Sequence, residues 1–344
     1  MTTIYNVAEL AKVSIKTVSR VMNEEFKVRR DTKERVLEAM KALDYYPSIA
    51  ARTMVTQKSG LIGVITSAIT SASRRGELAG LVKGIQSVVE ASGKTLIISD
   101  TGGVIGHAER LSQTFREHRV EGMIYVSDFT QSIKAPSSFS DIPSVLVNCF
   151  DSSGKTPSVA HNDEIGGFKM AEAAIRKGHR HIGFLSLPTE RVAGKDRQNG
   201  FRRAHKEMGV TLNEDLIIPC MGGSTFETEN TLMTEALSKI LNFDKKITAI
   251  CCGNDRMAMN LYKLLSQRGI SIPEDISVIG FDNYTMISEL LEPGLTTVDL
   301  PYTEIGKRGG EKLMNLIQGY EGESDILFER VPGEIVWRNS LVDI

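Results

Sequence analysis

Cysteine is scarce in this chain and long apolar runs are missing, and each absence excludes a class of protein. There are four cysteines in 344 residues and no C-x-x-C pair, so we expect buried, reduced thiols rather than a disulfide framework. No run of about 18 apolar residues exists, which excludes a membrane-spanning helix. The N-terminal string MTTIYNVAEL has neither a basic nor an apolar segment, so we expect no secretory signal and a cytoplasmic location.

Motifs for catalysis are missing as well. The chain has no G-x-S-x-G and no H-E-x-x-H, and its two Gly-Lys-Thr strings lack the earlier glycine of a P-loop. His179 and His181 stand two apart before an apolar run. Because a metal would need further ligands nearby, we expect a surface loop there. The sequence therefore predicts a protein that is not an enzyme and has no metal or cofactor.

Charge is nearly balanced over the whole chain but not along it. The net charge is -2, which argues against a polybasic coat for nucleic acid. Residues 1–58 hold 11 basic and 7 acidic residues, a balance of +4, and the rest of the chain has a balance of -6. This asymmetry indicates that only the N-terminal segment meets a polyanion.

Three helical patterns fill residues 1–46. Apolar residues recur at helical spacing along 7–11 and 15–22, and Ser14 is placed to cap the second segment. A third helix is predicted to open at Asp31, with a glutamate three residues later as in a capping box. Two short helices joined by a tight turn and braced by a third are typical of a helix-turn-helix domain.

The second of these helices presents side chains that suit double-stranded DNA. Lys16 and Arg20 can donate to guanine O6 and N7, and Ile15 can contact a thymine methyl. Four nearby side chains can donate to phosphates, namely Tyr5, Ser14, Thr17 and Asn23. The alternative is a helical bundle with a solvated charged face. The agreement of cap, apolar spacing and basic charge favours DNA binding.

Residues 47–59 are predicted to link this head to the rest of the chain. They could form about two turns of helix, which is too short to be stable alone. Met54 could insert between two base pairs from the minor groove. A plain linker is the alternative, and this segment considered alone favours it.

The strings IYNVAELAKVSIKTVSRVMN and VRRDTKERVLEAMKALDYYPSIAARTMVTQKSGLIGVI resemble the LacI/GalR family of transcription regulators. The resemblance covers the whole chain and implies that Ile15, Lys16 and Arg20 read bases. It maps the family's hinge pattern onto Tyr45, Pro47, Ala51, Arg52 and Met54. Three hinge residues are the expected DNA contacts, namely Ser48, Ala51 and Met54. Lys12 stands where the family often has Gly or Asn, so a positive φ there would carry strain.

Residues 60–344 alternate between apolar strand-like runs and helical patterns, which predicts an α/β fold with parallel sheets. Two such series imply two lobes. The resemblance adds that the lobes are like periplasmic sugar-binding proteins and that the chain crosses between them three times, near 159–163, 290–297 and 320–325. The predicted first lobe is about 60–160 with 293–321, and the predicted second lobe is about 161–292 with 322–344.

Ligands of such folds bind at the carboxyl ends of the strands. Polar residues stand at these positions, and the predicted ligand contacts are Asp163, Arg197, Asn254, Arg256 and Asp282. Paired guanidinium and carboxylate groups suit the hydroxyls or carboxylates of a sugar-like ligand. The alternative for each Asn or Asp alone is a helix cap. Matches to the family motifs R-x-x-G-F, N-D-x-M-A and G-F-D favour Arg197, Asn254 and Asp282 most.

One stretch departs from the family pattern. Where relatives commonly have I-S-N-P-F-F after the first body strand, this chain reads TSAITSASRR, without the aromatics. Arg74 and Arg75 are either solvated, which is the default for arginine, or they bind an anionic effector such as a sugar acid or sugar phosphate.

The sequence thus predicts a DNA-binding transcription regulator, a repressor by expectation, that is controlled by a small sugar-like effector. A near-palindromic operator would take one head per half-site, which predicts a homodimer. A periplasmic solute-binding protein is one rival, opposed by the helix-turn-helix head and the missing signal. A sugar-modifying enzyme is the other, opposed by the lack of a nucleophile or base constellation.

Overall fold

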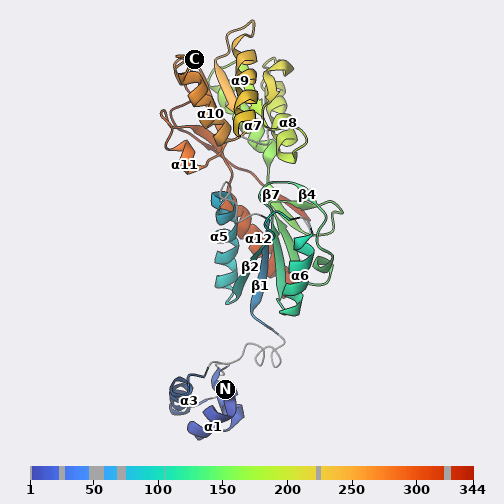
Figure 1. The fold of residues 1–344 in the computed structure, drawn as a ribbon, viewed down its shortest axis with the longest axis vertical. Helices are drawn as coiled ribbons and strands as arrows, with labels where there is room; N and C mark the ends of the chain where they lie inside the picture. The colour runs from blue at the N-terminus through green and yellow to red at the C-terminus, as the bar shows by residue number, and fades with distance from the viewer. Residues whose placement is uncertain are drawn as a thin grey trace. The chain divides into compact units, whose positions relative to one another are not determined.

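The protein is described by a computed structural model that covers residues 2–22, 28–45, 58–67, 75–104, 106–221, 226–320 and 327–344. The chain forms two compact units, Met1–Gly60 and Leu61–Ile344 (Figure 1). Several predicted contacts lie outside the described part of the chain, namely Asn23, Ser48, Ala51, Met54, Arg74 and the side chain of Arg75.

The first unit contains the three expected helices, α1 (Ile4–Leu10), α2 (Ile15–Met22) and α3 (Arg30–Ala42). Each contributes a fully buried valine to a shared core, namely Val7, Val18 and Val36. The turn between α1 and α2 contains Lys12 with a φ of 53°, so this non-glycine residue does adopt the left-handed conformation. The helix-turn-helix prediction is confirmed.

The capping box predicted at Asp31 is wrong. The N-cap of α3 is Arg29, which makes no side-chain cap hydrogen bond, and the helix has already begun when the chain reaches Asp31. Asp31 still lies in the first turn, where a carboxylate favours the positive end of the helix dipole. A side-chain cap is found instead on α1, where Asn6 Oδ1 accepts from the amide of Thr3 at 3.0 Å.

The first lobe of the second unit is built on a parallel sheet of six strands in the order β13-β7-β5-β3-β1-β2. Its strands are β1 (Leu61–Thr66), β2 (Thr95–Asp100), β3 (Gly122–Val126), β5 (Ser144–Val147), β7 (Ser158–His161) and β13 (Phe328–Val331). Helices α5 (Arg75–Ala91) and α12 (Tyr302–Gln318) pack side by side on one face, and α6 (His107–Glu117) and the 3-10 turn η1 (Ser137–Ser140) cover the other (Figure 1). A small parallel pair, β4 (Ser132–Ile133) and β6 (Phe150–Asp151), lies beside them.

The second lobe has another sheet of six strands, in the order β14-β12-β11-β10-β8-β9. Its strands are β8 (Ile182–Ser186), β9 (Ile217–Pro219), β10 (Ala249–Cys252), β11 (Ser277–Asp282), β12 (Thr296–Asp299) and β14 (Ile335–Val336), of which only β14 is antiparallel to its neighbour. Helices α7 (Asp163–Arg176) and α8 (Val192–Glu207) cover one face, and α9 (Phe226–Leu241) and α10 (Asp255–Ser266) cover the other. Two short turns complete it, η2 (Glu214–Leu216) and α11 (Thr285–Ser288).

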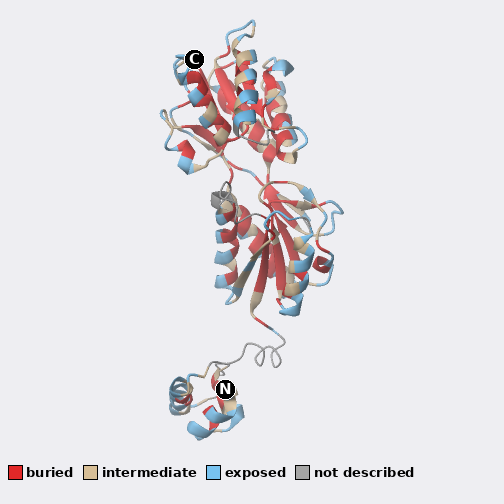
Figure 2. Cartoon of the chain, in the orientation of Figure 1, coloured by how far each residue is buried: buried red, intermediate tan, exposed pale blue. Residues whose placement is uncertain are grey.

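β5, β8 and β10, which lie inside the two sheets, are buried along their whole length, and Figure 2 draws the sheets largely in red. Helices on both faces of a parallel sheet require this, and it explains why these strands appear in the sequence as continuous apolar runs. Alternate residues serve opposite cores, so Cys251 packs toward α7 and α8 while Cys252 packs toward α9 and α10. All four thiols are free and buried, as expected.

The predicted lobe boundaries are wrong at two strands. β12, which was placed in the first lobe, pairs with β11 of the second sheet, and β13, which was placed in the second lobe, pairs with β7 of the first. The crossings therefore follow β7, β12 and β13. The strings TTVD and FERV carry no apolar run, and the partner of such a strand cannot be identified from its own residues.

His179 is also placed differently from the prediction of a surface loop. Its ring is fully buried, with Nδ1 2.9 Å from Thr248 Oγ1 and Nε2 3.1 Å from the carbonyl of Val342. Burial lowers the pKa of this imidazole. His179 thus links the segment after α7 to the start of β10 and to the C-terminal residues. No helix among the described residues is long and apolar enough to cross a membrane.

Candidate functional site

The free face of α2 carries the predicted base-reading residues. Ile15 is 40% exposed although it is apolar, Lys16 is exposed, and Arg20 is partly exposed. Ser14 Oγ accepts a hydrogen bond from the amide of Thr17 at 3.1 Å, so Ser14 caps this helix as predicted. The two hydroxyls also lie 2.9 Å apart and share one hydrogen bond, which leaves the other hydroxyl hydrogen for a further acceptor.

A second polar site lies between the two lobes of the second unit, at the carboxyl ends of their strands. Seven residues are predicted to contact the effector, and four of them line this cleft, namely Arg197, Asn254, Arg256 and Asp282. Asp163 stands behind the wall and contacts Arg197. Arg74 and the side chain of Arg75 lie outside the described part of the chain. Asn254 and Asp282, which stand at the ends of β10 and β11, thus lie at one sheet edge, as the rule for parallel strands predicts.

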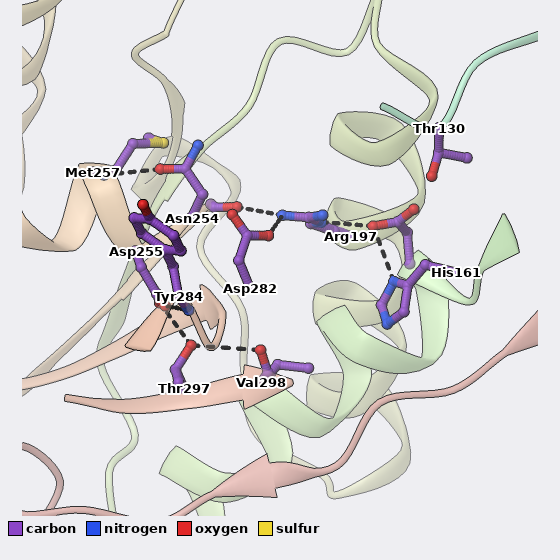
Figure 3. A network of polar contacts seen from close by, with 12 residues as sticks. Thr130, His161, Arg197, Asn254, Asp255, Met257, Asp282, Tyr284, Thr297 and Val298 are labelled. Carbon is purple, nitrogen blue, oxygen red and sulfur yellow. Dashed lines mark hydrogen bonds and ion pairs between the residues drawn. The ribbon is translucent and has the colours of Figure 1, made fainter. Parts of the chain in front are cut away.

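Arg197 is the centre of the polar network in Figure 3, and it is only 5% exposed. Its Nε donates to Asp163 Oδ1 at 2.7 Å, and its Nη1 donates to the carbonyl of Gly253 and lies 3.6 Å from Asp282 Oδ1. The guanidinium plane lies over the ring of Phe281, with Cζ 3.5 Å from the ring centroid. Contacts on this many sides hold the guanidinium in one position on the cleft wall.

The carboxylate of Asp163 is the buried counterion of Arg197. Burial by itself would raise the pKa of this carboxyl, but the adjacent guanidinium and His161, whose Nδ1 lies 3.4 Å away, hold it well below its usual range. Asp163 is therefore ionised at neutral pH, and it positions Arg197 rather than meeting a ligand itself.

The packing of α7 on α8 places this pair. A Cβ added to Gly167 would collide with the backbone of Arg197, and one added to Gly200 would collide with the backbone of Glu164. The two helices therefore approach at bare backbone, which only glycine permits. This close approach brings Asp163 and Arg197 within hydrogen-bond distance.

Asn254 is a helix cap that also stands at the cleft. It is the N-cap of α10, since its Oδ1 accepts from the amide of Met257 at 2.8 Å, and it also lines the cleft. Asp255 follows it and is fully buried, accepting from Thr297 Oγ1 and from the amide of Tyr284, each at 2.7 Å. Burial raises the pKa of Asp255 to about 7.

Asp282 ends β11 in an unusual backbone conformation. Its φ is 110° and that of Asn283 is 51°, so two consecutive non-glycine residues lie in the left-handed region. Such strain is found at functional sites, where the surroundings hold it in place. Here Asn283 donates to Asp299 Oδ1 at 2.9 Å and accepts from Arg338 at 3.0 Å, which fixes the turn and directs Asp282 to the cleft.

Sequence analysis missed several residues that line the cleft. They are Asp128, Phe129, Thr130, Asn148, Arg191 and Tyr302. Asp128 and Asn148 follow β3 and β5, so the strand-end rule applied to the first lobe would have found them. Arg191 lies over the ring of Phe129, 5.6 Å from its centroid. No comparable signal marked Tyr302, because α12 was not predicted and the crossing before it was expected a few residues earlier, near 290–297.

Among the described residues no group of three or more His, Cys, Asp or Glu side chains could hold a metal ion. The cleft thus offers guanidinium, carboxylate, amide and hydroxyl groups together with two aromatic rings. Such a surface binds and orients a small polar molecule.

A helix-turn-helix head joined to a two-lobed ligand-binding body defines the class of ligand-responsive DNA-binding regulators. Residues 3–48 match the description "Bacterial regulatory proteins, lacI family", and residues 171–341 match a periplasmic binding protein-like domain. The chain belongs to the lacI family. It is a DNA-binding transcriptional regulator of a repressor family and not an enzyme.

Curated relatives align over the full length. The chain is 36% identical to the HTH-type transcriptional repressor PurR of Vibrio cholerae serotype O1, across 100% of this chain and 99% of that one. It is 33% identical to the PurR repressor of Photobacterium profundum, across 100% of both chains.

Solved structures have the same fold. A LacI-family regulator from Rhizobium etli is 30% identical, with a TM-score of 0.74 over 83% of this chain and 100% of that chain. The lac repressor dimer bound to operator and the anti-inducer ONPF is 24% identical, with a TM-score of 0.78 over 99% of both chains.

Proposed function

We propose that this protein is a cytoplasmic repressor that binds a near-palindromic operator as a homodimer and is controlled by a small effector in the cleft. The observation that carries the proposal is the buried Arg197 held beside Asp282 on a cleft lined from both lobes. A ligand that bridges two lobes favours one arrangement of them and can thereby change the affinity of the chain for DNA. The likeness to an operator-bound dimer supports the homodimer.

On the DNA side, Ile15, Lys16 and Arg20 read bases in the major groove. The hydroxyls of Tyr5, Ser14 and Thr17 contact phosphates, for which their exposure on or beside α2 is suited. Within residues 47–59, Ser48, Ala51 and Met54 contact the minor groove, and Asn23 adds a phosphate contact. These four residues lie outside the described part of the chain, and sequence alone supports their roles.

On the effector side, the cleft favours a hydroxylated ligand that is neutral or anionic. Three guanidinium groups, those of Arg191, Arg197 and Arg256, face two carboxylates, those of Asp128 and Asp282. Asp282 suits a pair of neighbouring hydroxyls, and the arginines suit a carboxylate or phosphate. The rings of Phe129 and Tyr302 offer flat faces to a ring-shaped body. A sugar, sugar acid or sugar phosphate meets these requirements, and Arg74 and Arg75 would add to an anionic site.

The test begins with the melting temperature of the purified full-length protein in the presence of sugars, sugar acids, sugar phosphates and nucleosides. A ligand that binds the native state raises it by mass action. The best ligand is then added to a fluorescence anisotropy titration of operator DNA. We expect a sugar-class compound to shift operator affinity at least tenfold, and Asp282→Asn or Arg197→Lys to abolish that shift while operator binding without ligand persists.

The outcomes separate the parts of the proposal. If only nucleosides raise the melting temperature and shift operator affinity, the effector is not a sugar, but the proposal that the cleft controls DNA binding still holds. If a compound binds but operator affinity does not change, control by the cleft is wrong. A response that survives both substitutions would remove Arg197 and Asp282 from the site.

A further inference from the structure

A second pocket lies in the second lobe at the opposite edge of the sheet from the cleft. It is bounded by the last turn of α8, the loop from α8 to η2, the start of β8 and the loop after α9. The cleft residues Asn254 and Asp282 stand at the carboxyl ends of the strands, whereas this pocket lies at their amino ends. None of the residues that line it lines the cleft.

A buried histidine lines this pocket. His205 is only 2% exposed, and its Nδ1 lies 2.9 Å from the carbonyl of Phe201. Because a carbonyl only accepts, Nδ1 carries the hydrogen. Nε2 makes no hydrogen bond to any residue in the described part of the chain. This atom nevertheless keeps some solvent-accessible surface. It is therefore accessible from the pocket that His205 lines.

The ring of His205 is fixed and neutral. It packs against the ring of Phe201, with centroids 4.5 Å apart, which sets its orientation. Burial lowers the pKa of the imidazole, so Nε2 carries a lone pair at neutral pH. The pocket therefore presents a hydrogen-bond acceptor that requires a donor on whatever occupies it.

The rest of the pocket combines apolar walls with positive charge. Ile182, Leu216 and Phe243 contribute apolar side chains, and the first two are 2% and 4% exposed. Arg180 and Lys245 stand at the exposed rim. The carbonyls of Ile175 and His179 accept from Arg180 Nη1, each at 3.0 Å, which holds that guanidinium in place.

The one carboxylate of the pocket does not cancel these cations. Glu214 is already bound by Arg202, whose Nε lies 3.0 Å from both carboxylate oxygens. The remaining charge of the lining is therefore positive, which favours an anionic occupant.

We propose that this pocket is a second ligand site, separate from the cleft, that takes a small aromatic carboxylate bearing a hydroxyl group. The hydroxyl donates to His205 Nε2, the ring packs on Ile182, Leu216 and Phe243, and the carboxylate lies near Arg180 and Lys245. The hydroxyl, the ring and the carboxylate of the ligand thus each match one feature of the pocket lining. The site goes beyond control by the cleft, because its residues lie at the other edge of the sheet.

The experiment uses full-length protein and isothermal titration calorimetry with three probes of similar size. They are 4-hydroxybenzoate, benzoate, which lacks the donor, and 4-hydroxybenzyl alcohol, which lacks the charge. We expect 4-hydroxybenzoate to bind at least tenfold more tightly than either comparator, since one hydrogen bond or one ion pair changes affinity by about this factor. Equal binding of all three probes, or no binding of any, would overturn the proposal.

Substitutions then locate the probe. His205→Phe and the double change Arg180→Gln with Lys245→Gln should each weaken 4-hydroxybenzoate at least tenfold. The double change alters exposed side chains only, so it gives an answer even where His205→Phe unfolds the lobe. Arg268→Gln, an exposed arginine outside the pocket, is the matched control and should leave the affinity unchanged. Affinity that falls with Arg256→Gln instead would place the probe in the cleft and overturn the second site.

Discussion

Arg330 and Asp196 join the two lobes directly. Arg330 lies in β13 of the first lobe, Asp196 lies in α8 of the second, and Arg330 Nη1 donates to Asp196 Oδ2 at 3.1 Å. Asp196 immediately precedes Arg197, the centre of the cleft network. The pair therefore stabilises an arrangement in which both lobes line the cleft, and it acts on the helix that carries Arg197.

Loss of this pair should weaken the response to the effector. Both side chains are partly exposed, so the pair contributes about 0.5–1 kcal/mol, and Arg330→Gln or Asp196→Asn should raise the half-maximal effector concentration about two- to fivefold. The measurement is operator affinity against effector concentration. Arg176→Gln is the matched control, because Arg176 pairs with Glu172 on its own helix and joins no lobes. An unchanged midpoint in the Arg330 variant would show that the pair does not influence lobe closure.

The glycine contact between α7 and α8 should control both stability and effector response. Gly167→Ala places a methyl group against the backbone of Arg197, so the helices must separate. We expect the free energy of unfolding to fall by about 1–3 kcal/mol and the effector response to weaken, because Arg197 leaves Asp163. Chemical denaturation and the titration of operator affinity against effector concentration measure the two effects. Lys195→Ala, on an exposed position of α8, should change stability by less than about 0.5 kcal/mol. Normal stability in Gly167→Ala would mean that α8 accommodates the methyl group.

Most strands could be predicted because a strand that is buried on both faces of a parallel sheet appears in the sequence as a continuous apolar run. The helices between them were predicted from helical spacing of apolar residues. The run HIGFL predicted β8, and GMIYV predicted β3 over the same residues. β12 and β13 could not be assigned, since the strings TTVD and FERV owe their strand form to neighbours far away in the chain. Pairing between distant segments is a tertiary property that local pattern does not carry.

Part of the candidate site could be predicted from the sequence, and the rest depends on contacts between distant segments. Polar residues after apolar runs identified Asn254 and Asp282, because strand ends converge at one sheet edge. The pairing of Arg197 with Asp163 depends on the approach of α7 to α8, which only the folded chain defines. Tyr302 reaches the cleft from α12, a helix that the sequence pattern did not predict.

The buried carboxyl of Asp255 should make stability depend on pH. Burial raises its pKa to about 7 in the folded protein from 3.8, so the folded state binds more protons between pH 4 and 7. The free energy of unfolding contributed by this group is therefore fully present below about pH 4 and falls as pH rises to 7, by about 2–4 kcal/mol. Asp255→Asn keeps a partner for Tyr284 and Thr297 and should remove this slope. Denaturation midpoints at several pH values test it, and an identical slope in both proteins would assign the pH dependence elsewhere.

Two substitutions at α2 should distinguish a residue that contacts bases from one that contacts the DNA backbone. Arg20→Ala should cost about 1–3 kcal/mol on the operator and relax specificity at one base pair. Ser14→Ala removes the cap of α2 and a phosphate contact, so it should weaken all sequences more evenly. Binding to a set of operators with single base changes distinguishes the two. Unchanged discrimination in Arg20→Ala would mean that another face of the head meets DNA.

The segment 47–59 should connect the effector to DNA through its own folding. About two turns of helix are unstable alone but can form against a dimer mate in the minor groove, where Met54 would act as the wedge. An effector changes this only by its different affinity for two lobe arrangements. We therefore expect amides in this segment to exchange quickly in free protein and slowly on operator, and the effector to change that protection without altering the core of the head around Val18.

Substitutions of Met54 test the wedge itself. Met54→Ala removes the apolar volume that enters the base step and should lower operator affinity, while Met54→Leu keeps that volume and should retain or raise it. Hydrogen exchange and operator titration are measured on the same samples. Because the two variants differ in side-chain volume and not in charge, salt dependence should be equal in both. A segment already protected in free protein would instead mean that preformed heads are reoriented as rigid bodies.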